Sequence, residues 1–260
     1  MKPVIAAVLL VLVTGCVSTT TEGPSTAAGP QTGESNDPRN RARLRTELAS
    51  LYYSRGNMAV ALEELRLAVA ADKNYAPAHA MFGMVYMELN ENQLAQSSFE
   101  RAYSLAPTDP DINHNFGRFL CQTGRAPDSA RYFLQAVKNP LYPTPWRSYS
   151  AAGVCALRAG NLKDAEDYFL RALRLEPDEP TALLQLGHLR YKQNNMEEAQ
   201  KLVLRLNKLL TPTAESLWLA IRIERKLGGR AAEQSYAIQL RRRHPTSPEY
   251  LAMQRGEYDK

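Results

Sequence analysis

Residues 76–109 read APAHAMFGMVYMELNENQLAQSSFERAYSLAPTD, and this stretch decides the fold. Large apolar residues, small residues and a closing proline mark its frame: Phe82, Gly83, Tyr86, Ala95, Phe99, Ala102 and Pro107. The same frame recurs along the chain, with Thr144 and Pro145 as a two-residue insertion. The predicted units are 42–75, 76–109, 110–143, 146–179, 180–213 and 214–247.

A period of 34 residues resembles the tetratricopeptide repeat, in which each unit is a pair of antiparallel helices, A and B. A Gly or Ala at the eighth place lets helix B approach helix A closely, and a large apolar residue at the twenty-fourth place fills the space beside it. Glycines stand just past the predicted A helices, where a left-handed terminating residue is favoured: Gly56, Gly124, Gly160 and Gly228. One pair cannot bury its own apolar face, so several must stack. The sequence therefore predicts an all-α, right-handed superhelix of about six repeats over 39–247, with a C-terminal cap or tail at 248–260.

The first sixteen residues are typical of an exported lipoprotein. Lys2 precedes an apolar run at 4–13, which is about half the roughly 20 residues that span a bilayer, so it favours a signal peptide over a membrane helix. Gly15-Cys16 closes that run and resembles a bacterial lipobox, which implies removal of residues 1–15 and lipidation of Cys16. The alternative is an ordinary signal peptide with an incidental cysteine. Because no Asp follows Cys16, the resemblance implies the periplasmic face of the outer membrane.

The segment that follows the lipobox is predicted to be a tether. Residues 16–38 are rich in Ser, Thr, Gly and Pro and contain little that could pack, so we expect disorder there. Its root-mean-square reach is on the order of 25 Å. The repeats could thus lie near a membrane without being embedded in it.

Two cysteines remain, and both fall on predicted A helices of neighbouring repeats. Cys121 is the twelfth residue of the third repeat, and Cys155 is the tenth of the fourth. An oxidising periplasm would favour a disulfide between them, and closing a loop of about 34 residues is nominally worth about 3–4 kcal/mol. The alternative is two buried small apolar residues.

Over its whole length the chain resembles the type IV pilus biogenesis and stability lipoproteins, which are the pilotins of the pilus secretin. The most specific stretches are NFGRFL at 115–120, LYP at 141–143, AIRI at 220–223, SYAIQLRR at 235–242 and SPEY at 247–250. The resemblance implies a monomeric adaptor without catalytic activity, and we expect neither a cofactor nor a metal. It also implies that the protein binds the secretin and helps it to reach the outer membrane and to multimerise, so that pili can be made.

The inner wall of such a stack is formed by A-helix residues at the second, fifth, ninth, twelfth and thirteenth places. In the second repeat these places give Ala80, Met84 and Met87, an apolar and adaptable set. Further along, the wall becomes cationic and aromatic: Arg118, Arg147, Arg158, Tyr191, Lys192, Trp218, Arg222 and Arg225. We expect the apolar part to bind an amphipathic segment of the secretin, and the cationic part suits an acidic segment. The alternative is that the methionines pack internally and the arginines are simply solvated.

Other classes of function receive less support. The net charge is +5, but the export signal argues against nucleic acid, and the only dense basic run is Arg241-Arg242-Arg243. The four histidines show no metal-ligand spacing; His79 is expected in the core, and His114 and His188 are expected to face solvent in the groove. A rival adaptor function would be in outer-membrane protein assembly or with an envelope protease.

Overall fold

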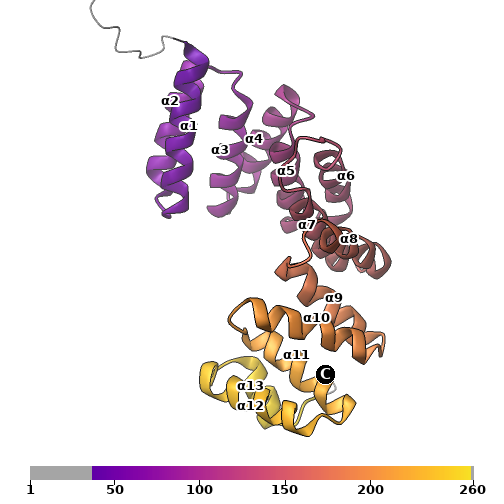
Figure 1. Ribbon diagram of the computed structural model, residues 1–260. Helices are drawn as coiled ribbons and strands as arrows, with labels where there is room; N and C mark the ends of the chain where they lie inside the picture. The colour runs from indigo at the N-terminus through magenta and orange to yellow at the C-terminus, as the bar shows by residue number, and fades with distance from the viewer. Residues whose placement is uncertain (1–36, 259–260) are drawn as a thin grey trace, which may run out of the picture. The chain divides into compact units, whose positions relative to one another are not determined.

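A computed structural model describes residues 37–258, and this part of the chain consists of thirteen α-helices without a strand. All of these helices belong to one unit, and Figure 1 shows them following one another as antiparallel pairs. The first three pairs are α1 (Pro38–Ser54) and α2 (Met58–Ala71), α3 (Ala76–Glu88) and α4 (Asn92–Leu105), and α5 (Pro110–Gln122) and α6 (Ala126–Ala136). The next three are α7 (Pro145–Arg158) and α8 (Leu162–Leu175), α9 (Pro180–Lys192) and α10 (Met196–Leu209), and α11 (Ala214–Leu227) and α12 (Arg230–Arg243). A shorter helix, α13 (Pro248–Gln254), ends the series, and the predicted all-α fold is confirmed.

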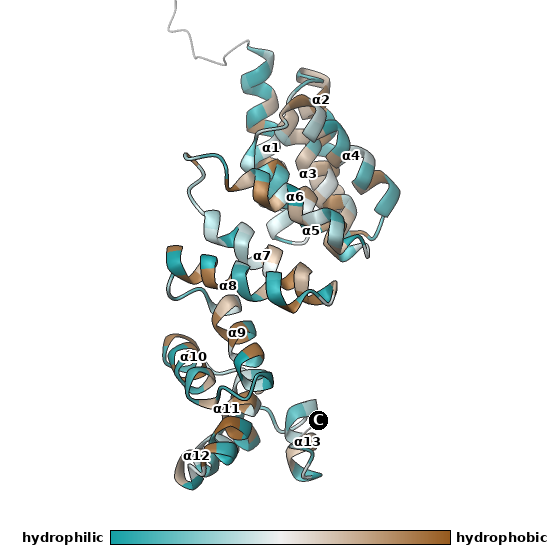
Figure 2. Ribbon diagram, turned by 90° about the vertical axis from the view of Figure 1, so that its right-hand side faces the viewer, coloured by the Kyte–Doolittle hydropathy of each residue, from teal (hydrophilic) through white to brown (hydrophobic). Residues whose placement is uncertain are grey.

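The helices stack as the repeat frame requires. Each odd-numbered helix packs on the even-numbered helix that follows it and on the next odd-numbered helix, so that α1, α3, α5, α7, α9 and α11 lie in sequence. Figure 2 shows teal and brown alternating along α8 and α10, as expected for amphipathic helices that bury one face. The odd-numbered helices are therefore the A helices.

Glycine at the eighth place sets the distance within three of the pairs. A Cβ added at Gly153 would lie 2.5 Å from the ring of Phe169, and one at Gly83 would lie 2.8 Å from the ring of Phe99. Real Cβ atoms do not approach other heavy atoms this closely. The B helix thus presses an aromatic ring onto bare backbone, as the repeat pattern predicts.

The turn between helices A and B has a left-handed residue in every repeat. The predicted glycines have positive φ, with Gly56 at 75° and Gly228 at 77°. In the second and fifth repeats the same place is held by Asn90 and Asn194, both at φ 60°. Asparagine is the non-glycine residue that tolerates this conformation best, so the turn persists where glycine is missing.

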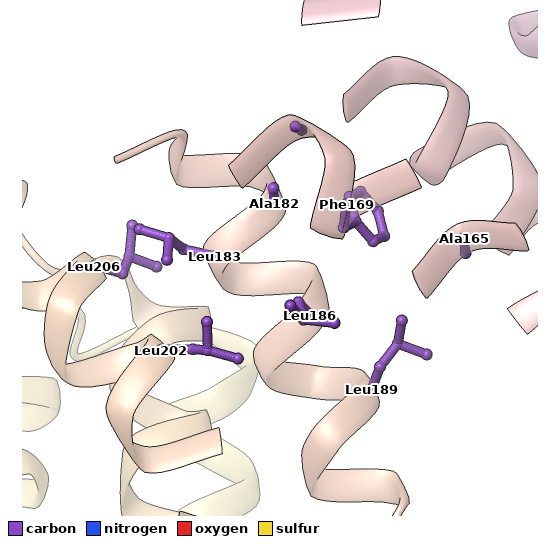
Figure 3. Close-up of a cluster of buried hydrophobic side chains, with 9 residues drawn as sticks. Ala165, Phe169, Ala182, Leu183, Leu186, Leu189, Leu202 and Leu206 are labelled. Atoms are coloured by element: carbon purple, nitrogen blue, oxygen red, sulfur yellow. The ribbon is translucent and has the colours of Figure 1, made fainter. Parts of the chain in front are cut away.

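The core runs between repeats as well as inside single pairs. Figure 3 shows one part of it, where Phe169 of α8 meets Leu186 of α9 and Leu202 of α10 is near. The complete cluster is Ala165, Phe169, Ala172, Ala182, Leu183, Leu186, Leu189, Leu202 and Leu206. Because three helices share it, a single helical pair would leave this apolar surface in water.

The first helix begins at Pro38, four residues before the start of the predicted unit 42–75 and inside the predicted tether. Asp37 is its N-cap, and its side chain accepts a hydrogen bond from the backbone N–H of Arg39 at 3.1 Å. An Asp at the N-cap followed by Pro in the first turn is a strong start signal, which moves the boundary toward the N-terminus. The signal peptide, Cys16 and the rest of the tether lie outside the described residues. Between residues 37 and 258, no helix combines the length and apolar character needed to cross a membrane.

Candidate partner-binding groove

A cavity of about 280 Å³ opens between α1, α3 and α5, on the A-helix side of the first three repeats. Its lining comes from all three helices and their N-terminal ends: Arg43, Thr46, Glu47, Ser50, Tyr75, Pro77, Ala80, Met81, Met84, Asp109, Asp111, Ile112 and Asn115. The predicted groove residues Ala80 and Met84 are both part of it. We call this cavity the N-terminal groove.

The floor of the N-terminal groove is apolar. Ala80, Met81 and Ile112 are buried, and Met84 is half-buried. Met84 also packs against the clusters of buried side chains on both sides of α3. A thioether on an unbranched chain adapts its shape, so this floor suits an apolar side chain of a partner.

The rim of the N-terminal groove carries charge. Arg43 Nη1 and Glu47 Oε1 form a salt bridge at 2.6 Å one turn apart on α1. Asp109 caps α5 and accepts a hydrogen bond from the N–H of Ile112 at 3.0 Å. Burial raises the pKa of the Asp111 carboxyl; the negative charge of Asp109 adds to this effect, and Arg147 opposes it. The rim therefore has one neutralised pair on α1 and two carboxyl groups on α5.

Met87, which was predicted to line the groove with Met84, does not line this cavity. It lies about one turn further along α3, half-buried against the aromatic cluster that contains Phe99, Phe116 and Phe119. Met87, at the twelfth place of this repeat, is therefore outside the N-terminal groove.

Arg118 of α5 and Arg147 of α7 both lie close enough to His114 for their positive charges to act on its imidazole. His114 is buried, its Nδ1 lies 2.9 Å from Ser148 Oγ, and its ring meets the ring of Phe133 edge-on at 5.8 Å. Burial, reinforced by the two arginines, lowers the pKa of His114 to about 3. The expectation that His114 faces solvent is wrong, because its ring fills the junction between the third and fourth repeats.

Cys121 of α5 and Cys155 of α7 are joined by a disulfide, with their Cα atoms 5.7 Å apart. Arg158, another predicted wall residue, is exposed and donates from Nη1 to Cys121 Sγ at 3.8 Å. Arg158 thus lies beside the covalent link between two A helices.

At the C-terminal end of the wall, the chain covers part of its own inner face. Trp218 is only 9% exposed, and its ring lies 5.2 Å from that of Tyr258. Arg222 Nε donates to the Tyr258 carbonyl oxygen at 2.7 Å, and the Arg225 guanidinium lies 4.1 Å from the Tyr258 ring centroid. Trp218, Arg222 and Arg225 were predicted to face a partner, whereas the C-terminal residues contact all three.

The remaining predicted wall residues lie near this end. Tyr191 is half-buried, and the guanidinium of Arg222 lies over its ring at 4.5 Å. Lys192 is exposed at the last position of α9. Neither lies in the N-terminal groove, so the predicted wall divides into an open N-terminal part and a partly covered C-terminal part.

The histidines do not form a metal site in the described part of the chain. Among residues 37–258, no three His, Cys, Asp or Glu side chains gather as metal ligands would. His79 is half-buried with Nε2 2.9 Å from the Lys73 carbonyl oxygen, so it is less enclosed than the core position expected for it. His188 Nε2 lies 3.1 Å from Glu215 Oε1.

Tetratricopeptide repeat models match residues 76–109, 114–180 and 156–215, which together span just over half of the chain. The chain belongs to the tetratricopeptide repeat family. Within this family, it is 29% identical to the type IV pilus assembly protein PilF of Pseudomonas aeruginosa, and the match covers 95% of each chain. The aligned region therefore includes N-terminal residues that precede the repeats.

Two solved structures of tetratricopeptide repeat proteins extend this likeness to three dimensions. The structure of Pseudomonas aeruginosa PilF has a TM-score of 0.79 at 28% identity, covering 84% of this chain and 99% of that one. PilW, described as a widely conserved type IV pilus biogenesis factor, has a TM-score of 0.73 at 28% identity, covering 82% of this chain and 97% of that one. The resemblance to type IV pilus biogenesis proteins that was inferred from the sequence is therefore confirmed in both sequence and structure.

Proposed function

We propose that this chain is a type IV pilus biogenesis factor that acts as an adaptor. It binds the pilus secretin and promotes its outer-membrane localisation and multimerisation. The observation that carries the proposal is the match to PilF over 95% of both chains, because repeat periodicity alone would not extend through the N-terminal residues. We also propose that the protein is a monomer, catalyses no reaction and binds no cofactor.

The N-terminal groove supplies the contact surface in this proposal. Its open A-helix side, apolar floor and polar rim match the way in which an amphipathic helix inserts one face into a groove. An apolar side chain of the secretin segment would lie on Met84 and Ala80. The rim would contact the polar face of that segment.

The proposal includes a lipid anchor at Cys16 that holds the repeats at the periplasmic face of the outer membrane. The match to PilF runs through this part of the sequence. We expect the Cys16→Ser protein to lose metabolic labelling with a fatty acid and to leave the outer-membrane fraction. Unchanged labelling and fractionation would remove the anchor from the proposal.

The groove is tested by filling it from its exposed side. Ser50 of α1 is exposed and lines the cavity, so Ser50→Trp should obstruct the groove without changing the core. Ser54→Trp is the matched control, because Ser54 is exposed one turn further along α1 and does not line the cavity. We expect the affinity for purified secretin to fall at least about tenfold for Ser50→Trp and to be unchanged for Ser54→Trp.

Equal secretin binding by the two variants would count against the N-terminal groove.

A chromosomal deletion distinguishes the proposed function from the rival function in outer-membrane protein assembly. Loss of surface pili and multimeric secretin supports the proposal, whereas a general loss of outer-membrane proteins would favour an adaptor of outer-membrane protein assembly.

A further inference from the structure

The inner face of the last repeat already holds a peptide, and that peptide is the end of the same chain. After α13, the backbone reverses at Gly256, whose φ of 71° favours glycine. Arg255 Nε and Glu257 Oε1 form a salt bridge at 2.9 Å across this turn. The turn directs Tyr258 back onto α11.

Tyr258 is recognised through both its side chain and its backbone. Its ring centroid lies 5.2 Å from that of the Trp218 indole and 4.1 Å from the guanidinium of Arg225. Its carbonyl oxygen accepts the 2.7 Å hydrogen bond from Arg222 Nε. A charged donor on a carbonyl and a cation over an aromatic face are two of the stronger contacts that a peptide can make.

The residues that hold Tyr258 are themselves held in place. Arg222 stacks on the ring of Tyr191 at 4.5 Å, and Arg225 Nη1 pairs with Glu233 Oε1 at 3.0 Å. Trp218 is fixed in a cluster with Leu217, Ile221 and Leu240. Such support is what a binding site requires, because each group is positioned before the ligand arrives.

The repeat register places these residues where the wall of a groove is expected. Trp218, Arg222 and Arg225 are the fifth, ninth and twelfth residues of the sixth repeat, and Tyr191 is the twelfth of the fifth. In the first repeat, the fifth and ninth places are Thr46 and Ser50, which line the N-terminal groove. The face that is open at one end of the wall is thus occupied by Tyr258 at the other.

We infer that Tyr191, Trp218, Arg222 and Arg225 form a second peptide-binding site, which takes an aromatic residue together with its main-chain carbonyl. Its occupant is the chain's own C-terminal segment, Arg255 to Tyr258. The site is closed to other peptides while Tyr258 is in place, and a segment of the same chemistry must displace it. This inference does not depend on the partner of the N-terminal groove.

The test supplies the C-terminal segment as a separate molecule. The probe is a fluorescently labelled synthetic peptide with the sequence of residues 254–260, and its binding is followed by anisotropy. The full chain with Tyr258→Ala has an emptied site and should bind the probe at least about tenfold more tightly than the unaltered chain. Tyr258→Phe, which keeps the ring, should behave like the unaltered chain.

Two further variants assign the binding to this site. In the Tyr258→Ala background, Arg222→Gln should weaken probe binding about tenfold, since a charge-assisted hydrogen bond is lost. Arg243→Gln in the same background is the matched control, because Arg243 is exposed at the end of α12 and lies outside the site. A probe peptide with Ala in place of its tyrosine should not bind.

Tryptophan fluorescence is a second measurement, and it reports on the occupancy of the site independently of the affinity for the probe. The chain has two tryptophans, so Trp146→Phe leaves Trp218 as the sole indole fluorophore. In that background, Tyr258→Ala should shift the Trp218 emission toward that of a solvated indole, and the probe should reverse the shift. The inference is overturned if the Tyr258→Ala chain keeps its helical circular dichroism and fails to bind the probe, or if the unaltered chain binds it equally well.

Discussion

Glycine at the eighth place of the repeat has a steric role that one substitution can measure. The ring of Phe169 lies where a Cβ on Gly153 would have to be, at 2.5 Å. At Gly187, the nearest atom to an added Cβ is a methyl group of Val203 at 3.1 Å, which would have to shift by only a few tenths of an ångström. The same substitution should therefore have unequal consequences at the two sites.

We expect Gly153→Ala to lower the free energy of unfolding by about 1–3 kcal/mol, as overpacking of a core does. Gly187→Ala should lower it less, because the contact is milder. Urea unfolding followed by circular dichroism measures both. Equal stability of the two variants would contradict the steric role of Gly153, because the closer contact with the Phe169 ring would then cost no more than the contact with Val203.

His114 predicts a dependence of stability on pH. Its pKa is lowered to about 3 in the folded chain, from an ordinary value of 6.5. Between these values the unfolded chain binds a proton that the folded chain does not, so stability is full above pH 6.5 and falls as the pH decreases toward 3. The slope is about 1.4 kcal/mol per pH unit for one proton.

His114→Gln keeps a polar partner for Ser148 and does not titrate. Between about pH 6.5 and 5, the unaltered chain should lose roughly 2 kcal/mol more stability than this variant. Unfolding free energies measured across this range decide the matter. Parallel profiles for the two proteins would contradict a buried, neutral imidazole.

The sequence can predict which residues line the groove where their place in the repeat alone determines it. Arg43, Thr46 and Ser50 are the second, fifth and ninth residues of the first repeat, the same places that singled out Ala80 and Met84 in the second. The predicted wall residues began at the second repeat, so these three residues of the first repeat were missed although they hold the same places. The register could not predict the contacts of Tyr258, since residues after 247 lie outside the repeat.

At the scale of elements, α5 and α7 are linked more firmly than their neighbours. Both are A helices, and the Cys121–Cys155 disulfide joins them across a sequence separation of 34. A loop of this length confines the unfolded chain, which corresponds nominally to roughly 3–4 kcal/mol. The third and fourth repeats should therefore unfold as one block while the disulfide is intact.

The double variant Cys121→Ala/Cys155→Ala should have a lower unfolding midpoint than the unaltered protein. A reducing agent should lower the midpoint of the unaltered protein and leave the double variant unchanged. If the protein isolated from its native cells has two reactive thiols after denaturation without reductant, the cysteines are only buried apolar residues there.

The helix boundaries depend on local capping signals as well as on the repeat spacing. The repeat predicts where pairs occur, but α1 begins at Pro38 because Asp37 and Pro38 form a local start signal. Similarly, Asn90 and Asn194 complete turns for which the glycine pattern gave no signal. Repeat spacing thus predicts the pairs, and capping chemistry decides where each helix starts and stops.

At the scale of the whole molecule, the two ends of the A-helix wall differ in availability. The first three repeats have an open cavity of about 280 Å³. In the last repeat, Tyr258 contacts Trp218, Arg222 and Arg225. A partner that meets the unaltered chain is therefore expected at the N-terminal groove first.

Site-specific photocrosslinking to purified secretin tests that expectation most directly. One photoreactive residue replaces Asp111, which is exposed on the rim of the N-terminal groove, and another replaces Leu94, which is exposed on α4 and does not line the cavity. We predict a crosslink to secretin from position 111 and none from position 94. Crosslinking from position 94 alone would place the secretin on the other side of the second repeat and contradict the groove.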